Sequence, residues 1–119
     1  MILVVDDNEI FSSALAAFLE KEGQTVQCAA NGEEGLRWLA NSPIRPSLVL
    51  LDVVMPVLDG WTFLTEMRKN PRLVKVPVVI MSADSNLSER AKQLGAAAVV
   101  RKPVAPETFS RIVEHFAST

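Results

Sequence analysis

Residues 47–52 read SLVLLD, an apolar run that ends abruptly in a carboxylate. The run shows no alternation of polar and apolar residues, which is typical of a strand buried on both faces in a parallel sheet between helices. Residues 2–7, ILVVDD, have the same form and end in two adjacent carboxylates. These two segments predict a parallel sheet whose strands carry acidic groups at one edge, because parallel strands end together.

Three further segments extend this sheet, and helical segments separate the strands. Apolar residues recur at helical spacing between the strands and after the last one, as at Phe109, Ile112 and Phe116. Gly23 and Gly95 stand where helix C-terminal caps are expected. Five strands alternating with five helices predict an α/β fold, a parallel sheet with right-handed crossovers. We expect strands at residues 2–5, 25–29, 47–51, 77–81 and 97–101.

Composition narrows the possible functions. The chain has 119 residues, 49% hydrophobic and 22% charged, which is typical of one compact domain. A net charge of −2 supplies no overall attraction to nucleic acids or to an anionic membrane. Cys28 is the only cysteine, so no internal disulfide forms, and no apolar run approaches the roughly 18–20 residues of a membrane span. We expect a cytoplasmic location, no contact with nucleic acid or membrane, and a single domain over residues 1–119 with no output domain.

Polar side chains follow four of the five predicted strands. Asp6 and Asp7 follow the first strand, Asp52 the third, Ser82 the fourth, and Lys102 lies just beyond the fifth. Open α/β sheets bind their ligands at the carboxyl ends of the strands. These five residues are therefore expected to converge on one site.

Each of these residues also has a purely structural alternative. An Asp after a strand often caps the following helix, so Asp7 or Asn8 is a candidate N-cap for a helix that begins near Glu9. Ser82 alone would be read as a turn residue, and Lys102 alone as a solvated surface lysine. The functional interpretation depends on their coincidence at one edge, because independent turn residues have no reason to supply complementary chemistry.

The carboxylates predict a bound cation. Two carboxylates about 4 Å apart repel by roughly 1 kcal/mol in water and about 4 kcal/mol at an effective dielectric of 20. With oxygen ligands alone, Mg²⁺ is favoured, since it keeps several waters and needs few protein ligands. A Mg²⁺ site beside a lysine and a hydroxyl suits phosphoryl transfer to a carboxylate. Asp52 stands singly at the end of the most apolar run, so it is the better acceptor candidate.

Over essentially its whole length, the chain resembles the receiver domain of two-component response regulators. The resemblance implies a flavodoxin-like sheet with strand order 2-1-3-4-5. It also implies a signalling domain that assists its own phosphorylation and dephosphorylation, with a histidine kinase or histidine phosphotransfer protein as the phosphoryl donor. The motifs that carry the resemblance are ILVVDDNE (2–9), NGEEGL (31–36), SLVLLDVVMPVLDG (47–60), VVIMSA (78–83) and LGAAAVVRKP (94–103).

The resemblance also implies a role for each acidic residue. Asp52 would be the phosphoacceptor. Asp7 and Asp52 would bind Mg²⁺ directly, and Asp6 directly or through water. The backbone carbonyl of Val54 would complete the protein ligands.

Further roles follow for the phosphoryl-binding and switch residues. Lys102 would contact the phosphoryl group, Ser82 would move to hydrogen-bond it, and the Lys102–Pro103 peptide would be cis. Two positions depart from the family pattern. Val99 stands where the switch residue is usually Tyr or Phe, and Val104 stands where Phe is common.

Two other functions fit parts of the pattern. A pseudo-receiver would bind a partner without phosphorylation, and the altered switch at Val99 is compatible with it. An aspartate-nucleophile phosphatase would need an acid two residues after the nucleophile, where this chain has Val54.

Asp59 is expected to cap the next helix, while Asp84 either caps a helix or orients a water.

Overall fold

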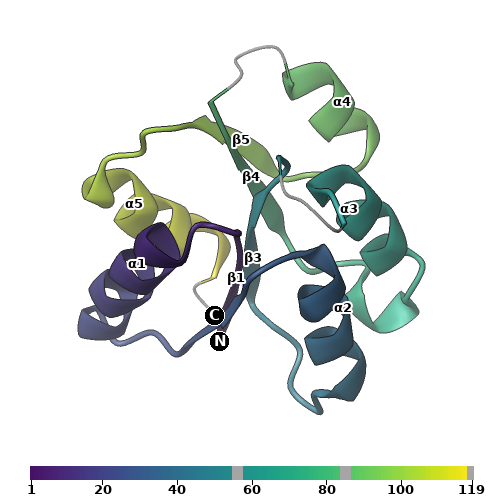
Figure 1. Cartoon of the computed structure of the whole chain (residues 1–119), viewed down its shortest axis with the longest axis horizontal. Coiled ribbons are helices and arrows are strands. Elements are labelled where there is room, and N and C mark those ends of the chain that lie inside the picture. Colours follow the sequence, from purple (N-terminus) through teal and green to yellow (C-terminus); the bar gives the residue numbers. More distant parts are fainter. Residues whose placement is uncertain (55–57, 84–86, 118–119) are drawn as a thin grey trace.

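The computed structural model describes residues 1–54, 58–83 and 87–117. Its strands form one parallel sheet in the order β2-β1-β3-β4-β5, with helices on both faces (Figure 1). This is the strand order that the family resemblance implies. The elements are β1 (Ile2–Val5), α1 (Glu9–Lys21), β2 (Val26–Ala29), α2 (Gly32–Asn41), β3 (Leu48–Asp52), α3 (Gly60–Arg68), a 3₁₀ turn η1 (Pro71–Leu73), β4 (Val78–Ser82), α4 (Ser88–Gln93), β5 (Ala98–Arg101) and α5 (Pro106–Phe116).

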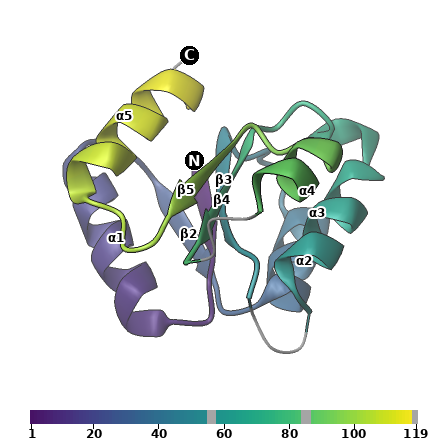
Figure 2. The same ribbon diagram turned by 90° about the horizontal axis from the view of Figure 1, so that it is seen from above.

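The sheet separates two hydrophobic clusters. Alternate residues of each strand point to opposite faces, so that in β1 Leu3 and Val5 join one cluster and Ile2 and Val4 the other. Helices α1 and α5 cover one face, and α2, α3 and α4 cover the other (Figure 2). Burial on both faces is the reason why the strand sequences contain continuous apolar runs.

Strand boundaries differ slightly from the sequence prediction. The strand β1 is as predicted, whereas the four later strands begin one residue later than predicted. Both β3 and β4 also extend one residue further, so Asp52 and Ser82 are the last residues of strands rather than the first residues of loops. Both side chains are consequently held in the sheet, and both residues are buried.

Helix ends resolve the capping alternatives. Asn8, not Asp7, is the N-cap of α1, and its side-chain oxygen accepts a hydrogen bond from the Phe11 N–H at 3.0 Å. Asp59 caps α3 as predicted and accepts from the Thr62 N–H at 2.9 Å. Because Asn8 takes the capping role, the Asp7 carboxylate stays available for another function.

The Arg68 guanidinium stabilises the amino-terminal edge of the sheet. It donates hydrogen bonds to the carbonyls of Leu73, Val74 and Val76 after α3, and to that of Gly95 after α4. Gly95 has φ of 80°, a conformation that glycine adopts without strain. One side chain thus links the connections that lead into β4 and β5.

Among the described residues, no helix combines the length and apolar character needed to cross a bilayer.

Candidate functional site

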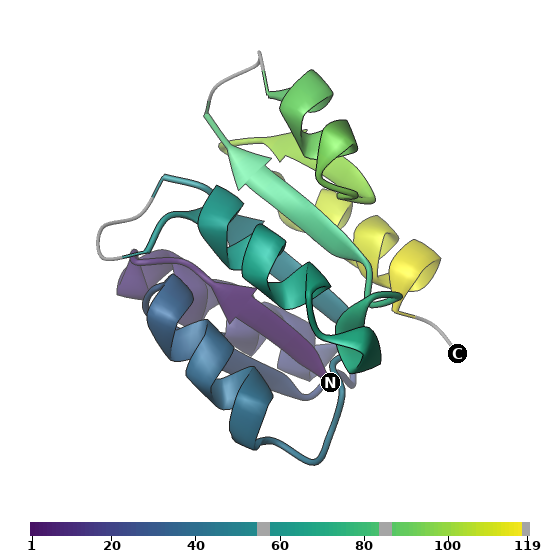
Figure 3. The same ribbon diagram turned by 90° about the vertical axis from the view of Figure 1, so that its right-hand side faces the viewer.

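The predicted site residues lie at the carboxyl edge of the sheet. In Figure 3 the arrowheads of β1 and β4 point to the same edge. Asp6 follows β1, Asp52 ends β3, Ser82 ends β4, and Lys102 follows β5. Because the four strands are parallel and in register, residues up to 96 positions apart in sequence come into contact.

Lys102 lies between two of the carboxylates. Its Nζ donates to Asp6 Oδ2 at 2.8 Å and stands 3.6 Å from Asp52 Oδ2. The Nζ also lies 4.6 Å from the centre of the Phe11 ring, a cation–π contact. The Asp6 side chain is fully buried and the Lys102 side chain is 23% exposed. The ammonium is thereby held at the site by Asp6 just after β1, by Asp52 at the end of β3 and by Phe11 on α1.

The adjacent carboxylates Asp6 and Asp7 have different environments. The buried Asp6 uses both oxygens within the protein, since Oδ1 accepts from the Asn8 N–H at 2.9 Å and Oδ2 accepts from Lys102. Asp7 is exposed. Of the two, Asp7 is the carboxylate with oxygens that face solvent.

Asp52 is buried at the end of β3, where it is 8% exposed. Burial raises the pKa of the Asp52 carboxyl, the negative charges of Asp6 and Asp7 raise it further, and the Val54 N–H and Lys102 lower it in part. The Val54 N–H donates to Asp52 Oδ1 at 3.1 Å. On balance the raised pKa shows that the protein's own donors do not fully compensate the charge of Asp52.

A divalent cation fits this group of residues. Asp6, Asp7 and Asp52 each offer a carboxylate oxygen, and these oxygens lie within 4.8 Å of one another. The donor set holds oxygen atoms and no sulfur or imidazole, which favours Mg²⁺ over softer metals. A cation there would favour the ionised form of Asp52, which burial and, to a lesser extent, the neighbouring carboxylates disfavour by raising its pKa.

The remaining predicted residues take defined places. The Ser82 carbonyl accepts from the Lys102 N–H at 2.8 Å, which joins the ends of β4 and β5, and the Lys102–Pro103 peptide is cis. Val54 is 73% exposed beside the site. Val99 is half-buried and packs on the cluster of α3 and α4, away from the carboxylates. Asp84 lies outside the described residues.

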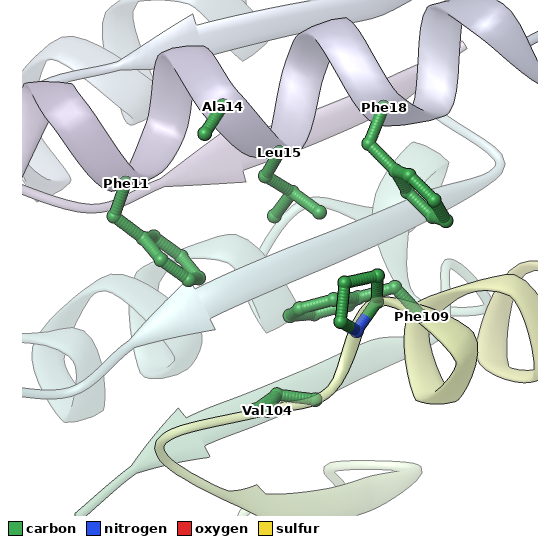
Figure 4. Close-up of a pocket in the computed structure, with 7 residues that line it drawn as sticks. Phe11, Ala14, Leu15, Phe18, Val104 and Phe109 are labelled. Carbon is green, nitrogen blue, oxygen red and sulfur yellow. The ribbon is translucent and has the colours of Figure 1, made fainter.

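Val104 packs beside α1. It lines an apolar pocket of about 200 Å³ between α1 and the start of α5, together with Phe11 and Phe109 (Figure 4). The Phe11 ring thus contacts both this pocket and the ammonium of Lys102. The contact between Phe11 and the site was not predicted from the sequence.

Gly60 positions the end of β3, a role that sequence analysis did not predict. A Cβ at Gly60 would lie 2.5 Å from Val53 Cα and 2.6 Å from the Asp52 carbonyl oxygen. The Gly60 N–H donates to the Val53 carbonyl at 3.2 Å. The first residue of α3 therefore packs directly against the backbone of the phosphoacceptor candidate. The signal in the sequence was Asp59-Gly60, which capping alone was sufficient to explain.

Comparisons with known proteins agree with the fold described above. Residues 2–114 match the family model of the response regulator receiver domain. Protein PilH of Pseudomonas aeruginosa is 34% identical over 114 residues, which cover 94% of this chain and 93% of PilH. The solved receiver domain of NtrX from Brucella abortus superposes with a TM-score of 0.87 at 28% identity, covering 100% of this chain and 99% of that domain.

Other relatives are longer than this chain. Response regulator Rre1 of Synechocystis is 34% identical over 117 residues, which cover 96% of this chain and 50% of Rre1. The chain also covers 54% of the probable transcriptional regulator ycf29 of Porphyra purpurea, at 29% identity. It therefore spans about half the length of these two curated relatives.

Proposed function

Because this chain belongs to the response regulator receiver domain family, we propose that it accepts a phosphoryl group on Asp52 and changes its partner binding in response. The observation that carries the proposal is the convergence of Asp6, Asp7, Asp52 and Lys102 at one sheet edge. The donor would be a phosphohistidine on a histidine kinase or a histidine phosphotransfer protein. We place the protein in the cytoplasm, as is typical of the family.

Four groups would hold Mg²⁺. Asp7 and Asp52 would bind it directly, and the Val54 carbonyl would complete the protein ligands. Asp6 would act through water, since both Asp6 oxygens already accept hydrogen bonds. When bound, the ion neutralises charge on the phosphoryl oxygens. The raised pKa of Asp52 supports this assignment, because it indicates a carboxylate that a nearby cation would stabilise.

The transfer step uses the Asp52 carboxylate as nucleophile. One of its oxygens attacks phosphorus, the P–N bond to the donor imidazole breaks, and a P–O bond forms to give an acyl phosphate. Lys102 Nζ, which lies 3.6 Å from Asp52 Oδ2, would contact a phosphoryl oxygen. Ser82 ends the neighbouring strand, and its hydroxyl would hydrogen-bond another phosphoryl oxygen. Attack of water on phosphorus later releases inorganic phosphate and restores the carboxylate.

The new charge then shifts a conformational equilibrium. Residues Ser82 and Val99, on β4 and β5, and the Lys102–Pro103 segment are the proposed switch. The smaller Val99 side chain fills less space between α4 and β5 than an aromatic residue would. We propose that the change at this position is smaller than in receivers with an aromatic switch residue.

Phosphatase turnover is disfavoured as an alternative. An aspartate-nucleophile phosphatase needs an acid/base group beside the nucleophile. Val54 occupies that position with an apolar side chain that is 73% exposed. The chain is a signalling domain, and its predicted catalysis is restricted to its own acyl phosphate.

A small acyl phosphate donor tests the proposal. We expect acetyl phosphate with Mg²⁺ to add one phosphoryl group to the protein, with the modified peptide containing Asp52, as measured by mass spectrometry. Chelation of Mg²⁺ should prevent the modification. Modification at any other residue, or equal modification without Mg²⁺, would contradict the assignment, and no modification at all would favour a pseudo-receiver.

The two adjacent carboxylates should differ in their effect on metal binding. We expect Asp7→Asn to weaken Mg²⁺ binding by about tenfold or more, because a direct ligand is lost. Asp6→Asn should weaken it less, because Asp6 acts through water and Lys102. Titration with Mg²⁺, monitored by NMR chemical shifts of the Asp52 amide, measures both affinities. A larger loss with Asp6→Asn would reverse the assignment.

A further inference from the structure

Part of the amino-terminal edge of the sheet, opposite the phosphorylation site, is basic. Parallel strands send all helix-to-strand connections to this edge, and Figure 3 shows the connections after α2 and after α3 there, beside the N-terminus. These connections contain no Asp or Glu, since residues 35–51 and 67–83 have none. Their exposed cations are Arg45, Lys69, Arg72 and Lys75.

Two exposed aliphatic side chains lie among these cations. Ile44 is 60% exposed and Val74 is 49% exposed. Each immediately precedes a cation in the sequence, Arg45 and Lys75 respectively. Single exposed aliphatic residues are ordinary, but here two of them occupy neighbouring connections within one cationic surface. We call the six residues Ile44, Arg45, Lys69, Arg72, Val74 and Lys75 the basic edge.

Hydrogen bonds join the two connections that carry the basic edge. Arg72, from the connection after α3, donates to the Ser42 carbonyl at 2.8 Å and to the Leu39 carbonyl at 3.4 Å at the end of α2. Arg68 holds the other side of the same connection by donating to the carbonyls of Leu73 and Val74. These bonds hold the turns that carry Ile44 and Val74 next to each other, so a ligand would lose little conformational entropy in ordering them.

Two of the cations are available for a partner. Lys69 pairs with Glu66 at 2.9 Å, and Arg72 is engaged by carbonyls. Within the described ranges, Arg45 and Lys75 have no carboxylate partner. The basic edge thus offers two unpaired charges and two apolar side chains.

We propose that the basic edge is a docking surface for a short acidic segment of a partner protein that carries aliphatic side chains. Carboxylates of the segment would face Arg45 and Lys75, and its aliphatic residues would cover Ile44 and Val74. Nucleic acid fits less well, because a phosphate backbone gains nothing from two aliphatic side chains. A flat anionic membrane would also meet the exposed Glu20, Glu22 and Glu66, which border the same edge.

Docking at this edge leaves the phosphorylation site open. The basic edge and Asp52 lie at opposite ends of the strands, so a partner held there would not cover the phosphoryl donor's approach. The affinity for the acidic segment should therefore be the same in the Asp52→Asn protein and should not depend on Mg²⁺. This independence separates the docking proposal from the proposed phosphorylation.

Fluorescence anisotropy with synthetic peptides tests the proposal. The probe is a fluorescein-labelled peptide of alternating Glu and Leu, and its partner probe alternates Glu and Ser. We expect the Glu–Leu peptide to bind more tightly and its binding to weaken with salt. The double variant Arg45→Glu/Lys75→Glu should weaken it by about tenfold, since two attractions become repulsions. Val74→Ser should reduce the preference for the Glu–Leu peptide.

Matched controls decide between occupants. Arg111→Glu reverses an exposed cation on α5 and should leave peptide binding unchanged. Equal weakening by Arg111→Glu, or no effect of the double variant, overturns the proposal. So does preferential binding of phosphatidylglycerol vesicles or duplex DNA through Arg45 and Lys75. Concentration-dependent self-association that the double variant abolishes, seen by sedimentation without peptide, would assign the basic edge to a second copy instead.

Discussion

Asp52→Asn is expected to take up no phosphoryl group from acetyl phosphate and, without Mg²⁺, to be more stable than the parent protein. The amide lacks the nucleophilic oxygen that forms the acyl phosphate. Stability should rise because burial and the charges of Asp6 and Asp7 disfavour the ionised carboxylate more than Lys102 and the Val54 N–H favour it. A gain of about 1 kcal/mol would raise Tm by roughly 4 °C in a domain of this size. Mass spectrometry and thermal unfolding in EDTA measure the two effects.

The stability gain should depend on pH in a defined direction. The pKa of Asp52 is raised above its ordinary value of 3.8 in the folded protein, so the folded state binds the proton more tightly. Below the unfolded pKa both states are protonated and Asp52 costs nothing. As pH rises through the folded pKa, the parent loses stability. The difference in urea midpoint between Asp52→Asn and the parent should therefore widen from acid to neutral pH.

Asp59→Asn is the matched control for this experiment. Asp59 is exposed and caps α3, and Asn is an equally good N-cap. We expect this variant to keep both phosphorylation and stability. If Asp59→Asn also gained stability toward neutral pH, the effect would belong to the net charge of the protein rather than to the environment of Asp52.

Gly60→Ala is expected to destabilise the fold by about 2–4 kcal/mol and to slow phosphorylation. The new Cβ would lie 2.5 Å from Val53 Cα and 2.6 Å from the Asp52 carbonyl oxygen, both backbone atoms of the segment that positions the acceptor. Relief of this contact requires the start of α3 to move away from the end of β3. Chemical denaturation measures the stability, and phosphorylation at a temperature where the variant is folded measures the displacement of Asp52.

Gly35→Ala provides a comparison on α2. A Cβ there would meet side-chain atoms only, at 2.9 Å from Phe63 Cε2 and 3.2 Å from Val5 Cγ2. Side chains can shift, and alanine is favoured over glycine within a helix by about 1 kcal/mol. We expect a smaller loss of stability and normal phosphorylation. Equal losses for the two variants would show that close packing at Gly60 has no special effect on the site.

The N-cap of α3 could be predicted from the sequence, whereas the N-cap of α1 could not. Asp59 was assigned correctly as an N-cap, because a short polar side chain before a helical stripe has few other roles. Asp7 and Asn8 were equivalent candidates for α1, and the structure selects Asn8. The choice depends on which of the two neighbouring side chains points toward the free N–H groups of the first helical turn. A shift of the helix start by one residue changes that.

The ion pairs and backbone contacts of the site could not be predicted from sequence patterns. Lys102 and Asp6 were predicted at the same edge, but their 2.8 Å contact requires β1 and β5 to be brought within reach of one ammonium. The strands are not neighbours in the sheet, because β3 and β4 lie between them. The contact joins Asp6 and Lys102 in the loops that follow these two strands, and no local pattern in the sequence encodes it.

The sequence by itself determined the elements, the sheet edge that carries the chemistry and the residue types gathered there. It could do so because strand burial on two faces and helix amphipathicity are local periodic signals, and because parallel strands must end at a common edge. Only the tertiary structure decided that Asp6 is neutralised by Lys102 while Asp7 faces solvent, and that Gly60 packs on the backbone beside Asp52. Those differences arise from contacts between residues distant in sequence, whose distances and burial are set only when the whole sheet is assembled.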